Sequence, residues 1–329
     1  MDVKKEAFMK CLGSTVRKIM EGIQVDFCGI QEIRMRVHTP LFIRYRGSEY
    51  AVTETGGLTG DIGKAYRITR QDIKEAVELI SNYSMYAYEE ELRQGYITIA
   101  GGHRIGMAGK IIMDGRHIKT MRYISFLNIR LSHEVKGCAT DVLPYLLDEK
   151  SRIYHTMIIS PPGCGKTTLL RDMIRQLSNG SCEREGVTVG VADERSEIGA
   201  CYKGEPQNDL GIRTDVLDGC PKAQGMMMLI RTMAPQVIAV DEIGNREDLE
   251  AMEYAINCGC RLIATVHGDS FQDIQDKPVL KSMVEKQLFD RFVLLNNRKK
   301  PGCVSSIMDG LGKVIWQQEG RRSCWKDLD

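Results

Sequence analysis

The sequence lacks the features that would place a protein in a membrane or outside the cell. It has no stretch of about 18 or more consecutive apolar residues, the length that a membrane-spanning helix requires. Its first residues, Met-Asp-Val-Lys-Lys-Glu, contain no apolar segment of the kind found in a signal peptide. We therefore expect a cytoplasmic protein.

An excess of charge of one sign is also missing. The chain has 45 Lys and Arg against 44 Asp and Glu, a formal net charge of +1. This balance produces no overall field that would attract nucleic acid or an anionic membrane. Local exceptions are a GxxG run at residues 60–63, as in a KH loop, and basic residues at 298–300 and 321–322. Because short matches are frequent by chance, a turn and a solvated tail are the simpler interpretation.

The 11 cysteines form no CxxC pair, and the two nearest, Cys258 and Cys260, are separated only by Gly259. A zinc site would need a second ligand pair at a suitable interval, and no histidine stands at one. We expect no zinc, and we expect the cysteines to be reduced thiols that are mostly buried.

The chain divides into two regions with different hydrophobic patterns. Residues 1–136 mix helical spacing with alternating stretches, which predicts a smaller α+β N-terminal domain. Gly101 and Gly102 suit a tight hairpin turn because glycine adopts positive φ readily. The expected elements are helices over 5–20 and after the N-cap Thr69, strands over 31–37 and 40–46, and a hairpin of 96–100 with 104–108.

Residues 137–329 alternate short apolar runs with helical segments. This alternation predicts an α/β domain with a mostly parallel sheet covered by helices. A terminal hairpin should turn near Asp309 and Gly310. The expected strands cover residues 154–159, 187–191, 237–240, 262–266 and 292–295.

The strongest motif is Ser-Pro-Pro-Gly-Cys-Gly-Lys-Thr-Thr at residues 160–168, between an apolar run and a helical pattern. It predicts a phosphate-binding loop: the glycines let backbone N–H groups surround phosphates, the lysine reaches the β and γ phosphates, and Thr167 ligates Mg²⁺. Ser160 replaces the usual first glycine, which leaves weaker nucleotide binding open. The expected nucleotide-binding residues are Pro162, Gly163, Cys164, Gly165, Lys166, Thr167 and Thr168.

A second motif ends the apolar run 237–240 in two acids, Asp241 and Glu242. A buried parallel strand delivers such carboxylates to the C-terminal edge of the sheet. We expect Asp241 to hold Mg²⁺ through water and Glu242 to orient and polarise the attacking water, since phosphoryl transfer depends on positioning. An acidic surface turn is the alternative.

Two further runs end in polar residues. Thr265 and His267 could sense the γ-phosphate from a neighbouring strand, although a lone histidine is more often structural. Asp193, Glu194 and Arg195 reach the same edge if their strand is parallel, and a surface turn explains them almost as well. Lys166 and Glu242, with Glu194 and His267, are our candidate catalytic residues.

Hydrolysis in such sites commonly needs an arginine, often donated across a subunit interface, to stabilise charge on the transferred group. The sequence does not single one out. Our candidates are Arg104, Arg130, Arg213 and Arg231.

The order of P-loop, Asp-Glu-Arg strand, Asp-Glu strand and Thr-x-His strand resembles the RecA-like ATPases of type II and type IV secretion and pilus retraction. Residues 211–225, 235–244, 32–37 and 101–106 are similar to a sporulation member of that family, so the resemblance spans nearly the whole chain. It implies a RecA-like P-loop NTPase domain over residues 137–329. The acidic box of the family falls on Asp193 and Glu194, and its histidine box on Thr265 and His267.

The resemblance also implies a function. It suggests a hexameric ATPase that uses ATP and Mg²⁺ in the mother-cell cytoplasm of a spore-forming bacterium. Such a motor would energise or assemble a channel through membrane-bound sporulation proteins, and would be peripheral at the forespore outer membrane only through them. A nucleotide-binding assembly scaffold without essential hydrolysis and a nucleic-acid-directed motor remain alternatives.

Overall fold

The computed structural model describes residues 3–84, 88–182, 184–296 and 303–318. It contains two compact units, the first made of Met1–His133 with Ala200–Gln207, the second of Glu134–Gly199 with Asn208–Asp329. The expected boundary at 136/137 therefore falls at 133/134, and a segment from within the second region joins the first unit. One hydrogen bond links this segment to the rest of the first unit: the Gly101 N–H donates to Gln207 Oε1 at 2.8 Å.

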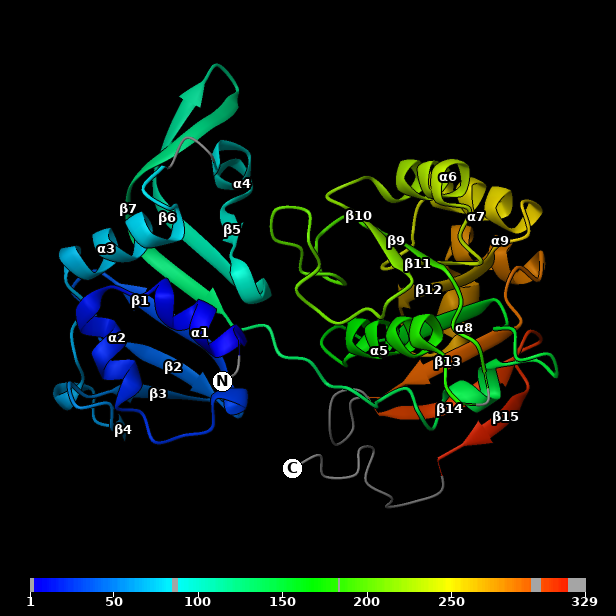
Figure 1. The fold of residues 1–329 in the computed structure, drawn as a ribbon, viewed down its shortest axis with the longest axis horizontal. Helices are drawn as coiled ribbons and strands as arrows, with labels where there is room; N and C mark the ends of the chain where they lie inside the picture. The colour runs from blue at the N-terminus through cyan, green and yellow to red at the C-terminus, as the bar shows by residue number, and fades with distance from the viewer. Residues whose placement is uncertain (1–2, 85–87, 183, 297–302, 319–329) are drawn as a thin grey trace. The chain divides into compact units, whose positions relative to one another are not determined.

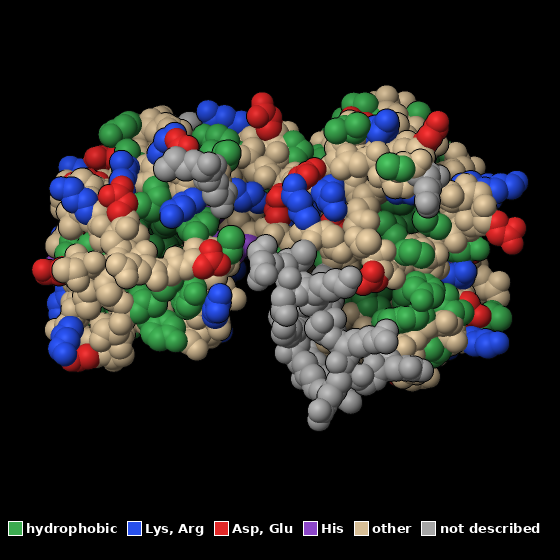
Figure 2. All heavy atoms as spheres, turned by 60° about the horizontal axis from the view of Figure 1, so that its bottom comes forward, with side chains coloured by type: hydrophobic (Ala, Val, Ile, Leu, Met, Phe, Trp, Pro, Cys, Tyr) green, Lys and Arg blue, Asp and Glu red, His purple; other side chains and the backbone are tan. Residues whose placement is uncertain are grey.

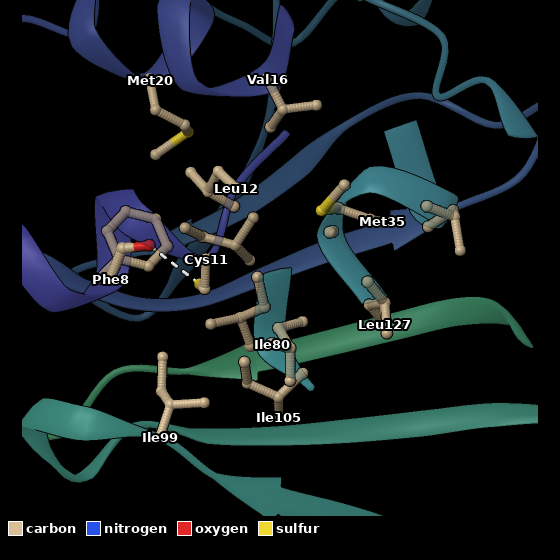
Figure 3. Close-up of a cluster of buried hydrophobic side chains, with 14 of the residues drawn as sticks. Phe8, Cys11, Leu12, Val16, Met20, Met35, Ile80, Ile99, Ile105 and Leu127 are labelled. Carbon is tan, nitrogen blue, oxygen red and sulfur yellow. Dashed lines mark hydrogen bonds between the residues drawn. The ribbon is translucent and has the colours of Figure 1, made fainter. Parts of the chain in front are cut away.

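The first unit is an antiparallel sheet covered by helices, as the alternating pattern predicted (Figure 1). Its strand order is β4-β3-β2-β1-β7-β6-β5. Phe8 of the first helix and Leu12, just after that helix, pack with Met35 and Ile105 of the sheet in one core (Figure 3). The elements are α1 Val3–Lys10, α2 Ser14–Glu21, β1 Ile30–Arg36, β2 Phe42–Tyr45, β3 Ser48–Val52, β4 Leu58–Thr59, α3 Arg70–Ile80, α4 Glu89–Gln94, β5 Tyr96–Thr98, β6 Arg104–Asp114 and β7 His117–Arg130.

The prediction of a single helix over residues 5–20 was wrong. Gly13, with φ −60° and ψ 161°, interrupts it, so that α1 ends at Lys10 and α2 begins at Ser14. The apolar spacing persists across the break because Leu12 and Val16 are both fully buried. The predicted start after Thr69 is confirmed, and so are the strands near 31–37 and 40–46 and the hairpin of β5 with β6.

The second unit has a sheet ordered β10-β9-β11-β12-β8-β13-β14-β15, parallel from β10 to β13 with an antiparallel edge. All five predicted strands are confirmed, and so is the terminal hairpin. β10 was missed because three of its five residues are polar. The elements are β8 Thr156–Ser160, α5 Lys166–Asn179, β9 Val189–Asp193, β10 Thr214–Asp218, α6 Lys222–Met233, β11 Val237–Val240, α7 Arg246–Asn257, β12 Arg261–His267, α8 Phe271–Asp276, α9 Pro278–Glu285, β13 Arg291–Leu295, β14 Val304–Asp309 and β15 Val314–Gln317.

Helices cover both faces of this sheet. Ile158 of β8 packs in the core that contains α5, whereas its neighbours Met157 and Ile159 pack in the core that contains α6, α7 and α9. Because successive side chains of a strand point to opposite faces, a strand buried on both sides is apolar throughout. This explains the continuous apolar runs, and it leaves the polar residues at the ends of the strands.

The surface carries charges of both signs, as the composition predicted, and most of the described cysteines are free thiols. Lys and Arg side chains are interspersed with Asp and Glu on the face in Figure 2. Within the described ranges, no helix has the length and apolar character to cross a membrane. Nine cysteines there carry free thiols, five of them buried. Cys303 is disulfide-bonded, so the expectation of reduced thiols was wrong for this residue.

Candidate nucleotide-binding site

The P-loop connects the end of β8 to the start of α5. Gly163 and Gly165 have φ values of +73° and +87°, a region that strains other residues, so the tight loop depends on glycine. A Cβ built on Gly163 would meet no atom within 4 Å, so open space lies beside the backbone there. The first N–H groups of α5 have no partner within the helix and carry its positive end. The loop is therefore shaped to bind an anion.

Ser160 fits the loop without the glycine that is usual there. It is the last residue of β8, is fully buried, and does not adopt positive φ. Its hydroxyl donates to the carbonyl of Pro161 at 2.7 Å, so the added polar group is satisfied locally. Cys164 is also buried and directs its Sγ to the carbonyl of Pro162 at 3.6 Å.

Lys166, the first residue of α5, reaches across to the acids that follow β11. Its side chain is 6% exposed, and Nζ lies 3.1 Å from Glu242 Oε1 and 3.6 Å from Asp241 Oδ1. Nζ also lies 3.3 Å from His267 Nε2. A buried charge requires such partners. The four residues predicted from separate motifs therefore meet at one point.

Thr167 and Asp241 also meet directly. The Thr167 hydroxyl donates to Asp241 Oδ2 at 2.7 Å, and Thr265 on β12 donates to Asp241 Oδ1. Hydroxyl and carboxylate oxygens are the ligands that Mg²⁺ prefers in proteins. The donors predicted for the metal therefore lie together, and Thr265 orients one of them.

Glu242 is held in a strained backbone conformation with φ +54°. Its N–H donates to Thr265 Oγ1 at 3.0 Å, and its carbonyl accepts from Lys222 Nζ at 2.8 Å. A non-glycine residue in this region costs energy and persists only where its surroundings hold it, often at functional sites. These two bonds hold the backbone of Glu242 in this conformation.

The Glu242 carboxylate is surrounded by donors. Oε1 lies 2.8 Å from His267 Nε2, and Oε2 accepts from Arg195 Nη1 at 2.7 Å, in addition to the bond with Lys166. Burial by itself raises the pKa of Glu242, but hydrogen bonds and charges from Lys166 and His267 outweigh it, so the pKa is below its ordinary value. The carboxylate is thus ionised at neutral pH.

Asp193, at the end of β9, binds the backbone of the turn that follows the strand. Asp193 is buried, and its carboxylate accepts from the backbone N–H groups of Glu197, Ile198 and Gly199 at 2.9, 3.0 and 2.8 Å. Burial raises the pKa of Asp193 to about 6. This carboxylate organises the turn after β9.

Glu194 lies at the mouth of the site. Its Oε2 is 3.1 Å from Lys222 Nζ, the same atom that binds the Glu242 carbonyl. A small pocket at this edge of the sheet is lined by Ala192, Asp193, Glu194, Arg195, Glu197, Lys222, Asp241 and Glu242. The structure therefore brings Glu194 to the same pocket as the acids of β11.

None of the four arginine candidates is among the residues that line this pocket. Arg104 and Arg130 belong to the first unit, Arg213 Nη1 donates to the carbonyl of Ser178 near the end of α5, and Arg231 is in the last turn of α6. Their use across a subunit interface stays a prediction. The GxxG run forms a turn in which Asp61 accepts the Gly63 N–H at 2.9 Å, and residues 298–300 and 321–322 lie outside the described residues.

Sequence reasoning placed Arg195 at this edge of the sheet without giving it a role, and it missed Lys222. The expectation that Arg195 reaches this edge if its strand is parallel is confirmed, since β9 is parallel to β11 and Arg195 bonds Glu242. Lys222 begins α6 without a recognisable motif, because its role comes from the packing of α6 beside β9.

Known structures share this architecture. The Legionella pneumophila ATPase DotB aligns with a TM-score of 0.51 and 14% identity over 85% of this chain and 74% of that one. The pilus retraction motor PilT, solved with ADP, aligns with a TM-score of 0.52 and 14% identity over 89% and 81%. The fold is that of the RecA-like secretion ATPases.

Within that class the family is clear. The family model for sporulation stage III protein AA matches residues 2–315. Stage III sporulation protein AA of Bacillus subtilis (strain 168) is 42% identical over 295 residues, 90% of this chain and 92% of that protein. The chain belongs to the sporulation stage III protein AA family.

Proposed function

We propose that the chain is a Mg²⁺-dependent ATPase that hydrolyses ATP to ADP and phosphate. The observation that carries this proposal is the meeting of two separate motifs. Lys166 and Thr167 of the P-loop lie against Asp241 and Glu242 at the end of β11, at distances of 2.7 to 3.6 Å. The residues suit both a phosphate group and its metal ion.

Thr167 and Asp241 would hold Mg²⁺, which would neutralise charge on the phosphate oxygens when bound. Their oxygens already lie within hydrogen-bonding distance of each other. Thr265 keeps the Asp241 carboxylate in place from the neighbouring strand. This support does not depend on the nucleotide.

Lys166 would exchange its bond with Glu242 for one with the phosphates, at the positive end of α5. Glu242, released from Lys166 and ionised, would then accept a proton from the attacking water and orient it. His267 stays within reach of the same carboxylate and can donate to it. Glu194, paired with Lys222, would complete the polar edge of the pocket.

The cellular role that we propose is a motor for spore formation. Membership of the sporulation family and the fold shared with DotB and PilT support an oligomeric motor, a hexamer in our proposal, in the mother-cell cytoplasm. It would act on membrane-bound channel proteins at the forespore. An arginine from a neighbouring subunit, one of the four candidates, would complete the site.

ATP hydrolysis by the purified protein, measured over a range of protein concentrations, tests this proposal. We expect turnover per chain to rise with concentration, and to be lost in Lys166→Ala, which lacks the phosphate-binding charge, and in Glu242→Gln, which lacks the base. Binding of Mg·ATP without turnover above these variants would contradict hydrolysis and favour the assembly scaffold.

A further inference from the structure

We propose that Arg195 is the counter-ion of Glu242, a positioning residue from the same chain that keeps this carboxylate in place while ATP is bound. The inference rests on the proposed ATPase site and adds a residue to it. It starts from how the two carboxylate oxygens are shared. Oε1 is bound by Lys166 and His267, whereas Oε2 accepts a hydrogen bond from Arg195 Nη1 at 2.7 Å.

Nucleotide binding disturbs this arrangement on one side. The phosphates require Lys166, so Oε1 loses its cation just as a polyanion arrives beside it. A carboxylate left uncompensated in this position would repel the γ-phosphate. Arg195 binds the other oxygen, so it can remain when Lys166 leaves.

The backbone around Arg195 is anchored. Asp193 precedes it by two residues, and its buried carboxylate accepts the N–H groups of Glu197, Ile198 and Gly199. The turn that carries Arg195 is therefore tied to the end of β9. The Arg195 side chain is 64% exposed, which leaves it room to follow the carboxylate during the exchange.

The acid next to Arg195 in the chain has its own partner, so it does not compete with Glu242 for Arg195. Glu194, next in the chain, is paired with Lys222 at 3.1 Å, and Lys222 also donates to the Glu242 carbonyl. Besides Lys166, two cations thus hold Glu242: Lys222 by its backbone and Arg195 by its side chain. Arginine suits the second task because its charge persists at any physiological pH.

A double-mutant cycle on nucleotide affinity tests the proposal without requiring turnover. Binding of Mg·ADP and of a non-hydrolysable Mg·ATP analogue is measured for the parent, Arg195→Ala, Glu242→Gln and the double variant. We expect Arg195→Ala to weaken the ATP analogue about tenfold and ADP much less, since the γ-phosphate faces Glu242. In the Glu242→Gln background, Arg195→Ala should have no further effect.

Two more variants separate a local role from a general one. Arg195→Lys, which keeps a cation, should recover most of the affinity for the ATP analogue. Arg246→Ala removes an arginine that is 87% exposed at the start of α7 and should leave both affinities unchanged. Thermal unfolding of each variant checks the fold, and a purely structural role would not change the ratio of the two affinities.

The opposite results overturn the inference. An equal loss for ADP, or a loss that persists in the Glu242→Gln background, would mean that Arg195 does not act through Glu242; the persistent loss would place it on the phosphate itself. Hydrolysis is followed in parallel. A parent that binds nucleotide but never turns it over contradicts the ATPase proposal, while the affinity cycle still decides the role of Arg195.

Discussion

Asp193 shows how a single buried acid can organise the turn that carries other residues of a site. Its carboxylate ends β9 and closes the turn that carries Arg195. Because three N–H groups converge on it, the turn depends on an oxygen acceptor at this position. The acidic strand that resembled a catalytic box thus contributes architecture through Asp193 and charge through its neighbours.

This burial predicts a specific dependence of stability on pH. The pKa of Asp193 is about 6 in the fold against about 3.8 unfolded, so the folded state favours the protonated acid. Its contribution to the free energy of unfolding is therefore full below about pH 4 and falls by about 3 kcal/mol as pH rises through about 6 toward neutrality. In urea unfolding at acidic and neutral pH, the change in stability with rising pH should be less favourable for the parent than for Asp193→Asn by this amount. Equal slopes would contradict it.

At the scale of elements, α3 depends on its first residues. The Thr69 side chain accepts the N–H of Asp72, and the Asp72 carboxylate accepts from the Thr69 N–H and hydroxyl and from the Tyr66 hydroxyl. We expect Thr69→Ala to lower the free energy of unfolding by about 1 kcal/mol, because an N-terminal donor loses its partner. Thr69→Ser, which keeps the hydroxyl, should stay near the parent in chemical denaturation. Similar losses in both variants would show that the methyl group matters instead.

Elements with a local signal could be predicted from the sequence. Thr69 marked the start of a helix, and the apolar runs marked strands buried on both faces. The break at Gly13 was not predictable from spacing alone, since Leu12 and Val16 stay buried on either side of it. β10 escaped because its pairing with β9, not its own composition, makes it a strand.

In the candidate site, too, the residues that belong to local sequence motifs could be predicted. Lys166, Asp241 and Glu242 belong to motifs that are contiguous in sequence, and parallel strands bring their ends to one edge of the sheet. The bond between Arg195 and Glu242 joins residues 47 positions apart. No local pattern encodes such a pair, so the structure was needed to find it.

At the scale of the whole molecule, the segment Ala200–Gln207 belongs to the first unit although its neighbours in sequence belong to the second. The Gln207 side chain accepts the Gly101 N–H and donates to the Glu205 carbonyl, while Ala200 and Gln207 lie against Gly102. We expect Gln207→Ala to speed hydrogen exchange at the Gly101 amide by removing a bond worth about 1 kcal/mol. Gln272→Ala, in α8 of the second unit, is the matched control. Unchanged exchange at Gly101 would show that the segment binds by other contacts.

The same segment sets an order of events during translation. A ribosome delivers the chain from its N-terminus, so residues 1–133 emerge long before residue 207. All strands of the sheet in the first unit precede residue 133, so this sheet can assemble early, but the last segment of the unit arrives only after the P-loop and β9 have been made. Synthesis of the two units is therefore interleaved, and a nascent chain stalled before residue 207 would carry an unfinished first unit.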